Sequence, residues 1–221
     1  MIKNEKRCVV LYSGGLDSSL AACLMIEQGY DVDLLHMNQG ALISNHLSKI
    51  RYQEIKEIYP KSNITLSYMQ VAGYFRSIAL ASIENDILEN GVNLVCIGCK
   101  LAMHAKAIIH CLNNNIKNVA DGATKRQERY GEQRKCAIER IRKLYQKYGI
   151  NYVNPVYEYE KTDIKYGLFD RGLTIQALED TCLFSKTFTT PTDSMIETYI
   201  DKKSKIFNEI IERSLSYEKN R

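Results

Sequence analysis

Short apolar runs alternate with amphipathic stretches along the chain. The runs are rich in Val, Ile, Leu and Tyr, as buried β-strands are, and they cover residues 7–12, 31–37, 64–71, 92–95, 118–120 and 152–157. The stretches between them carry apolar residues at helical spacing, and they cover residues 18–28, 47–58, 75–89, 100–113, 132–148 and 195–215. This alternation predicts a Rossmann-like α/β fold, with a parallel sheet, helices on both faces and a small C-terminal helical extension.

The order of these elements also predicts where a ligand binds. In an open parallel sheet, ligands bind outside the carboxyl ends of the strands. The residues that directly follow strands are 13–19, 36–39, 96–100 and 121–126. No linker rich in Pro, Ser or Gly divides the 221 residues, so we expect a main domain, residues 1–190, followed by the helical extension, residues 191–221.

Composition narrows the class of protein. Charged residues make up 25% and hydrophobic residues 45%, an ordinary balance for a folded domain. We expect a cytoplasmic protein without membrane contact. No apolar run reaches the roughly 20 residues that span a bilayer, and the first seven residues do not resemble a secretory leader. The seven cysteines are then expected to be free thiols, available for metal binding, catalysis or burial.

A glycine-rich turn, SGGLDSS at residues 13–19, follows the first predicted strand and opens the first predicted helix. Its adjacent glycines, Gly14 and Gly15, let backbone N–H groups approach an anion closely, and the helix N-terminus adds partial positive charge. The hydroxyl donors of this turn are Ser13, Ser18 and Ser19. Asp17 suits either a Mg²⁺ ion that bridges to phosphates or the cap of the helix.

This turn resembles the SGGxDS pyrophosphate loop of the N-type ATP pyrophosphatases, the PP-loop family, and the resemblance extends over residues 6–186. It implies that the chain binds ATP with Mg²⁺, transfers AMP to a substrate oxygen and releases pyrophosphate. It also implies that adenine lies at the end of the second strand, at His36, Met37 and Asn38. Asp121 and Gly122 would then lie in a loop that closes on the nucleotide. His36 is equally compatible with a structural role at a strand end.

A C-x-x-C pair lies at the predicted start of a helix, in the run Cys96-Ile97-Gly98-Cys99-Lys100. A helix N-terminus and a neighbouring lysine lower the pKa of thiols, so we expect Cys96 and Cys99 to be reactive. Such a pair performs redox chemistry, binds a metal or carries sulfur. A four-cysteine zinc site would need a second close pair, which the sequence lacks.

A lone cysteine, Cys182, follows Cys99 after 83 residues. This arrangement resembles the iron–sulfur members of the same family, which include cluster-dependent tRNA thiolases and the sacrificial sulfur transferases of nickel-pincer cofactor synthesis. The resemblance implies that Cys96, Cys99 and Cys182 hold a [4Fe-4S] cluster whose open iron delivers sulfide. The alternative without a cluster is a persulfide on one cysteine that another resolves. We expect the apolar neighbours of three other cysteines to place them in the core: Cys8, Cys23 and Cys111.

Positive charge gathers in residues 117–147, which hold ten Lys/Arg and four Asp/Glu, whereas the whole chain has a net charge of +4. The candidates there for holding a tRNA backbone or a phosphorylated small molecule are Lys125, Arg126, Arg129, Arg134 and Lys135. The alternative is a solvated helix face with internal charge pairs. Lys100 and Lys186 either neutralise ATP phosphates or are ordinary surface lysines.

Together these features predict an ATP-dependent sulfurtransferase that thiolates a tRNA base or a small molecule. Its predicted catalytic residues are Asp17, Cys96, Cys99, Lys100 and Cys182. Its predicted partners are the sulfur acceptor and a sulfur donor, either a desulfurase or free sulfide, and a homodimer is compatible with the sequence.

Two other classes of protein remain open. A ligase similar to the 7-cyano-7-deazaguanine synthases would adenylate a carboxylate and would need the turn but not the cysteines, although the chain lacks the four-cysteine zinc cluster expected of those enzymes. A nucleotide-binding protein without turnover would need only the turn.

Overall fold

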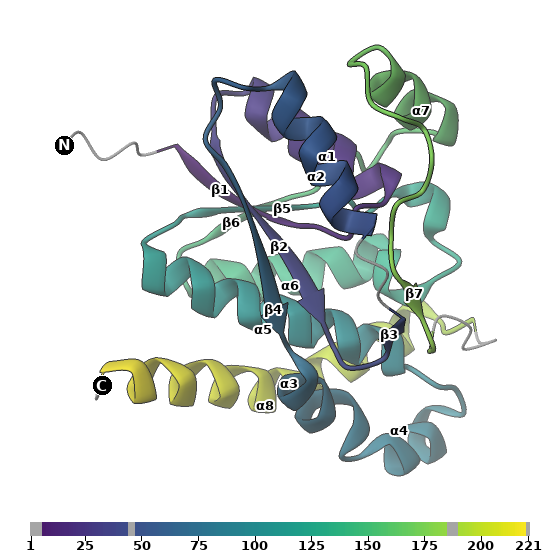
Figure 1. Ribbon diagram of the computed structural model, residues 1–221. Helices are drawn as coiled ribbons and strands as arrows, with labels where there is room; N and C mark the ends of the chain where they lie inside the picture. The colour runs from purple at the N-terminus through teal and green to yellow at the C-terminus, as the bar shows by residue number, and fades with distance from the viewer. Residues whose placement is uncertain (1–5, 44–46, 185–189, 220–221) are drawn as a thin grey trace.

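Five parallel strands form the central sheet of the computed structural model, which describes residues 6–43, 47–184 and 190–219 (Figure 1). The strands are β1 (Arg7–Leu11), β2 (Asp31–Asn38), β4 (Ile64–Gln70), β5 (Asn118–Asp121) and β6 (Asn151–Val153). Their order across the sheet is β4-β2-β1-β5-β6, and every neighbouring pair is parallel. The sheet therefore grows outward from β1 in both directions, as in doubly wound α/β folds.

Helices cover both faces of this sheet, which confirms the predicted fold class. One face packs against α1 (Leu16–Glu27), α2 (Leu47–Ile58) and α7 (Lys161–Phe169). The other face packs against α5 (Val95–Asn114), which is flanked by α6 (Lys135–Lys147) and α8 (Asp193–Lys219). Two hydrophobic cores result, one on each side of the strands. Because both faces are covered, the central strand β1 reads as a continuous apolar run rather than as an alternating one.

The predicted strand at residues 92–95 does not form. The Asn93 side chain accepts a hydrogen bond from the backbone N–H of Val95 at 2.9 Å, and α5 begins at Val95. An asparagine at this position satisfies one of the free N–H groups of a helix start. The helix predicted from residue 100 therefore begins five residues earlier, and the C-x-x-C pair lies inside its first two turns.

The predicted helix at residues 75–89 is broken into three pieces: α3 (Ala72–Phe75), the π-helical turn η1 (Arg76–Leu80) and α4 (Ile83–Asn90). The break brings Asp86 of α4 to α8. There the buried carboxylate accepts hydrogen bonds from Lys203 at 2.5 Å and Lys202 at 3.1 Å. Apolar spacing alone does not show such a break, because all three pieces keep an apolar side on the core.

A short antiparallel ribbon joins two segments that are far apart in the sequence. In it β3 (Leu42–Ile43) pairs with β7 (Thr181–Cys182), with Leu42 opposite Cys182. Strands this short carry no readable pattern, and neither one was predicted. The ribbon returns the segment after α7 to the carboxyl end of the sheet (Figure 1).

Among the described residues, α5 alone is long and apolar enough to cross a membrane by length and composition. The sequence analysis found no such segment. The most apolar window of α5 is 61% buried inside the fold, where Leu101, Ala105 and Ile108 are fully buried against the sheet. Its apolar character therefore serves the core of this domain.

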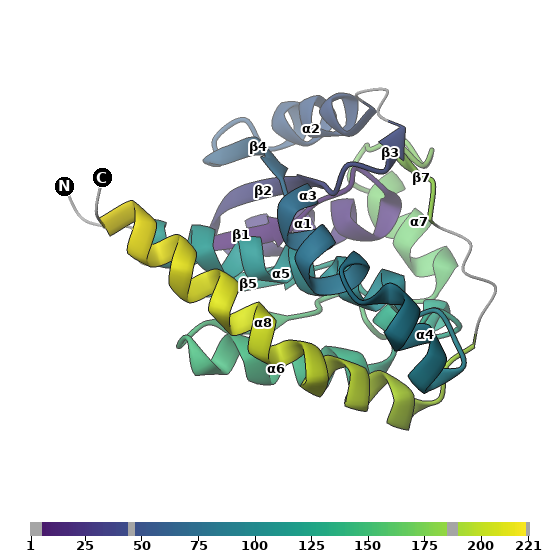
Figure 2. The ribbon, with the colours of Figure 1, turned by 90° about the horizontal axis from the view of Figure 1, so that it is seen from below.

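The last helix, α8, runs along α5 and α6 on the outside of that face (Figure 2). Its inward side chains belong to the same core as the sheet: Ile196, Tyr199, Ile200, Phe207 and Ile211. The division into residues 1–190 and 191–221 remains a prediction, and the extension packs directly on the main domain.

We expect Phe207→Ala to lower the free energy of unfolding by about 3–5 kcal/mol, because Phe207 is fully buried and its removal leaves a cavity. Urea denaturation followed by circular dichroism measures this loss. The control Lys205→Ala changes an exposed position of the same helix and should stay within about 0.5 kcal/mol. A similarly small loss for Phe207→Ala would show that α8 does not contribute to the core.

Candidate functional site

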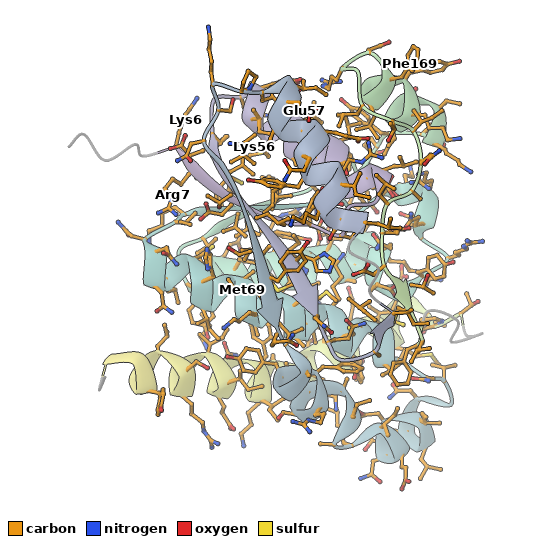
Figure 3. All side chains as sticks on the ribbon, viewed as in Figure 1. Lys6, Arg7, Lys56, Glu57, Met69 and Phe169 are labelled. Atoms are coloured by element: carbon orange, nitrogen blue, oxygen red, sulfur yellow. The ribbon has the colours of Figure 1, made fainter. Side chains whose placement is uncertain are left out.

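A cavity of about 450 Å³ opens at the carboxyl ends of β1, β2 and β5. It is lined by the glycine-rich turn, the end of β2, the start of α5 and the segment that leads into β7. Lys6 and Arg7, labelled in Figure 3, lie at the amino end of β1, the end opposite to the cavity. The cavity therefore lies where the strand order predicts a ligand site.

The turn at residues 13–19 is packed too tightly for side chains at its glycines. Gly14 has a φ of +85°, and a Cβ there would lie 2.6 Å from Ser48 Cα and would also strike the carbonyl of Leu178. A Cβ at Gly122, after β5, would lie 2.5 Å from the backbone nitrogen of Ser18. The turn is thus enclosed by three other segments.

Hydrogen bonds inside the turn fix its serines. The hydroxyls of Ser18 and Ser19 donate to the carbonyl of Gly15 at 3.2 and 2.7 Å. The Ser13 hydroxyl lies 3.1 Å from that of Ser18 and accepts from the Gly15 N–H at 3.2 Å. The turn is preorganised at the N-terminus of α1, where backbone N–H groups favour an anion.

Asp17 points toward the loop after β5. Its carboxylate forms an ion pair with Arg126 and accepts a hydrogen bond from Gln127 at 3.0 Å. Burial raises the pKa of Asp17, and Arg126 opposes that rise. Arg126, one of the basic residues predicted to contact RNA, therefore points inward to the turn.

The end of β2 contacts the segment before β7. His36 Nε2 lies 2.9 Å from Asp180 Oδ2, and both side chains are almost fully buried. The buried Nδ1 atom of His36 has no hydrogen-bond partner among the described residues. Met37 is also buried and lines the cavity.

Asp121, at the end of β5, is held by the protein itself. Its carboxylate accepts hydrogen bonds from Tyr152 and Asn154, both at 2.6 Å, and Lys100 Nζ lies 3.2 Å away. Burial raises the pKa of Asp121, but the surrounding charges and hydrogen bonds, of which the Lys100 charge has the largest effect, lower it to about 2. The carboxylate is therefore always ionised, and it fixes the Lys100 ammonium on the wall of the cavity.

A buried histidine completes this network. His104 Nδ1 lies 2.8 Å from the hydroxyl of Tyr145. Burial lowers the pKa of His104 to about 3, and the neighbouring Lys100 charge lowers it further. His104 is therefore neutral at physiological pH and serves the packing beneath Asp121.

Three thiols line the same cavity, from two segments far apart in sequence: Cys96, Cys99 and Cys182. Gln39 Nε2 donates to Cys182 Sγ at 3.3 Å, and Cys96 Sγ lies 3.6 Å from the carbonyl of Phe184. The described residues include no group of three His, Cys, Asp or Glu side chains that could hold a metal ion. The ribbon of β3 and β7 thus places Cys182 on the wall of the cavity that the C-x-x-C pair also lines.

The expected low pKa of the C-x-x-C thiols is wrong. Burial raises the pKa of Cys96 to about 12, and the Glu132 carboxylate raises it further. Burial also raises the pKa of Cys99, with added effects of Cys182 and Cys96. Desolvation outweighs the helix N-terminus and Lys100, so both thiols are protonated at rest.

Several residues that line the cavity were missed by the sequence analysis. They come from the loop after β5 and from the segment before β7: Gln127, Glu132, Glu179 and Asp180. Gln39, at the end of residues 36–39, is also buried there. Only the short distance of Glu179 and Asp180 from Cys182 in the sequence could have drawn attention to them.

The other cysteines and lysines have plainer surroundings. Cys8, Cys23 and Cys111 are fully buried, which confirms that they belong to the core. Cys136 is half-buried on α6. Lys186 lies outside the described residues.

The predicted basic surface is smaller than the sequence suggests. Arg134 forms an ion pair with Asp193 at 2.8 Å, and Arg126 forms one with Asp17. Arg129 is exposed and stacks 4.7 Å above the ring of Tyr130, at the mouth of the cavity. Lys125 and Lys135 are also exposed.

Comparison with known proteins gives a family match and several relatives. A family profile described as "Family of unknown function (DUF7411)" matches residues 6–207. The tRNA-specific 2-thiouridylase MnmA of Chlorobium phaeobacteroides is 27% identical over 121 residues, which cover 49% of this chain and 30% of that protein. The 7-cyano-7-deazaguanine synthase of Methanospirillum hungatei is 30% identical over 121 residues, 42% of this chain and 55% of that protein.

A second 7-cyano-7-deazaguanine synthase, from Sulfolobus acidocaldarius, is 56% identical over 36 residues, 16% of this chain and 8% of that protein. The thiouridylase and the synthases belong to the PP-loop ATP pyrophosphatases, which confirms the resemblance found in the turn. The chain spans about half the length or less of these curated relatives.

The solved structures include a crystal structure described as a predicted subunit of tRNA methyltransferase from Methanocaldococcus jannaschii. It is 19% identical to this chain, with a TM-score of 0.44, and the alignment covers 80% of this chain and 96% of that one.

We expect native Cys96 and Cys99 to react with iodoacetamide at pH 7.5 at least about a hundredfold more slowly than free cysteine, because burial keeps both thiols protonated. Alkylation quenched at intervals and read by peptide mass spectrometry measures each site. In urea, where burial is lost, both should approach the rate of free cysteine. Native rates close to that of free cysteine would contradict the raised pKa values.

Proposed function

This chain belongs to the DUF7411 family, whose function is unknown, and on the basis of its site we propose that it is an ATP-dependent sulfurtransferase. One observation carries the proposal: an anion-binding turn and three thiols from separate segments line one cavity. The turn suits the phosphates of ATP, and the thiols suit the transfer of sulfur. Its homology to PP-loop ATP pyrophosphatases supports the use of ATP.

In the first step, a carbonyl oxygen of the acceptor attacks the α-phosphorus of ATP, and the bond to the β,γ-pyrophosphate breaks. The turn at residues 13–19 holds the phosphates through its N–H groups and the N-terminus of α1. Lys100, fixed by Asp121, contributes positive charge from the facing wall. The products are an adenylated acceptor and pyrophosphate.

Magnesium fits the oxygen donors beside the turn. Asp17 supplies a carboxylate and Ser13 a hydroxyl, and these are the hard oxygen ligands that Mg²⁺ prefers. When bound with ATP, the ion offsets phosphate charge. Asp17, which Arg126 and Gln127 orient, is the residue we assign to holding it.

In the second step, a sulfur atom replaces the adenylated oxygen. A persulfide on one of the three cysteines attacks the carbon, and AMP leaves with the oxygen. A second cysteine then attacks the cysteine-bound sulfur of the resulting disulfide. The thiolated product is released, and a disulfide remains between the two cysteines. A persulfide donor and a thiol reductant restore the starting state.

For a [4Fe-4S] cluster, only the chemical type of the available ligands gives support. Cysteine thiolates are the ligands that such a cluster takes, but the described residues show no group close enough to hold a metal ion. We therefore route no step through a cluster, and iron analysis decides whether one is present.

We propose a tRNA base as the acceptor. The thiouridylase relative is named for tRNA, and Arg129, Lys125 and Lys135 are exposed cations that can contact a phosphate backbone. Arg129 also holds the exposed ring of Tyr130 at the mouth of the cavity, where it can stack on a base. A phosphorylated small molecule is the other acceptor that this surface suits.

A second candidate function is a ligase that adenylates a carboxylate. Two relatives named 7-cyano-7-deazaguanine synthase favour it, and they match this chain over 42% and 16% of its length. This reaction uses the turn and leaves the three thiols without a role.

We expect Asp17→Asn to lower pyrophosphate release from ATP and unmodified tRNA by at least about a hundredfold, because this change removes the carboxylate that we assign to holding magnesium beside the phosphates. A coupled pyrophosphate assay measures the rate. The control Asp170→Asn removes an exposed carboxylate outside the cavity and should keep the full rate. Full activity of Asp17→Asn would remove Asp17 from the mechanism.

We expect Cys99→Ser to abolish the formation of thionucleosides while pyrophosphate release continues, because adenylation does not use the thiol. Mass spectrometry of digested tRNA and the pyrophosphate assay measure the two steps separately, and Cys136→Ser serves as the control outside the cavity. A ligase would keep its complete reaction in Cys99→Ser. Iron and sulfide analysis of both variants after anaerobic purification shows whether Cys99 also retains a cluster.

A further inference from the structure

The phosphate-binding turn already contacts a carboxylate of the chain itself. Glu179 Oε2 lies so close to Gly15 that a Cβ on this glycine would clash with it, and the Glu179 Cδ atom would be 3.0 Å away. The Ser13 hydroxyl hydrogen-bonds this carboxylate. The Glu179 residue is otherwise exposed, yet its charged end lies where the turn offers N–H groups to an anion.

The backbone around Glu179 is anchored on both sides. The fully buried guanidinium of Arg51 donates to the carbonyls of Thr174 and Gln176, both at 2.6 Å. After Glu179, Cys182 pairs with Leu42 in the ribbon of β3 and β7. The backbone of Glu179 is therefore fixed beside the turn. Its side chain, which carries the carboxylate, can still rotate away from the turn.

Two carboxylates consequently face the same anion site. Asp17 is offset by Arg126 and Gln127, whereas Glu179 contacts the neutral Ser13. Burial raises the pKa of Glu179, and the negative charge of Asp17 raises it further, although the Ser13 hydrogen bond and the Arg126 charge oppose this rise. A phosphate group without a cation is repelled by these like charges, and a cation bound to the phosphate cancels that repulsion.

We infer that Glu179 makes the turn discriminate against metal-free polyphosphate and in favour of its magnesium complex. This inference rests on the proposed function, because it takes the turn as the site of the ATP phosphates. It assigns to Glu179 a role in specificity that neither the motif at residues 13–19 nor the three cysteines supply. Glu179 keeps uncomplexed polyanions out of a site that would otherwise bind any phosphate.

Calorimetric titration of the full chain with inorganic pyrophosphate tests this role, once in EDTA and once in excess Mg²⁺. We expect Glu179→Gln, which keeps the shape and removes the charge, to bind metal-free pyrophosphate about tenfold more tightly than the wild type. Its affinity for magnesium pyrophosphate should change by less than about threefold. The matched control is Glu57→Gln, which removes the same charge from an exposed position of α2 outside the cavity (Figure 3).

Three results would overturn the inference. Weaker binding of magnesium pyrophosphate by Glu179→Gln would make Glu179 a ligand of the metal. Equal affinities of wild type and Glu179→Gln in both titrations would make it a bystander, and the proposed function would stand. Absence of pyrophosphate binding in every protein and condition would remove the proposed function together with the inference.

Discussion

The site depends on close backbone packing around Gly14 and Gly122. Each glycine lies against another segment at a distance that a Cβ would not allow. These contacts bring the first turn of α1, the loop after β5 and the segment before β7 together around one anion site. A side chain at either glycine would push one of these segments away from the others. The chemistry of the cavity therefore rests on side chains that are missing as much as on those that are present.

Local patterns predicted the features that a single segment determines. The strands beside β1, the glycine-rich turn and the helix at residues 47–58 lie where the sequence indicated, because short-range apolar spacing and turn residues decide them. Asn93 shows the limit of such patterns. Residues 92–95 have the apolar character of a strand, but the Asn93 side chain accepts a hydrogen bond from the backbone N–H of Val95, where a helix begins instead.

The parts of the site that the sequence did not predict depend on contacts between distant segments. Asp180 reaches His36 across more than 140 residues, and Arg126 reaches Asp17 across 109. The pKa of the Cys96 thiol illustrates the same limit for chemistry. A helix start and a nearby lysine predict a reactive thiolate with a lowered pKa. Burial raises the pKa instead, and burial is defined only by the folded chain.

The segment 179–182, which ends in β7, contributes to three parts of the cavity within four residues. Glu179 faces the turn, Asp180 contacts His36, and Cys182 joins the other thiols. Successive residues of an extended segment point to opposite sides, so inserting or deleting one residue here would reverse the side chains that follow. The spacing of this segment is thus as constrained as its composition, and grafting its chemistry onto another scaffold would require transferring the whole segment with both of its anchors.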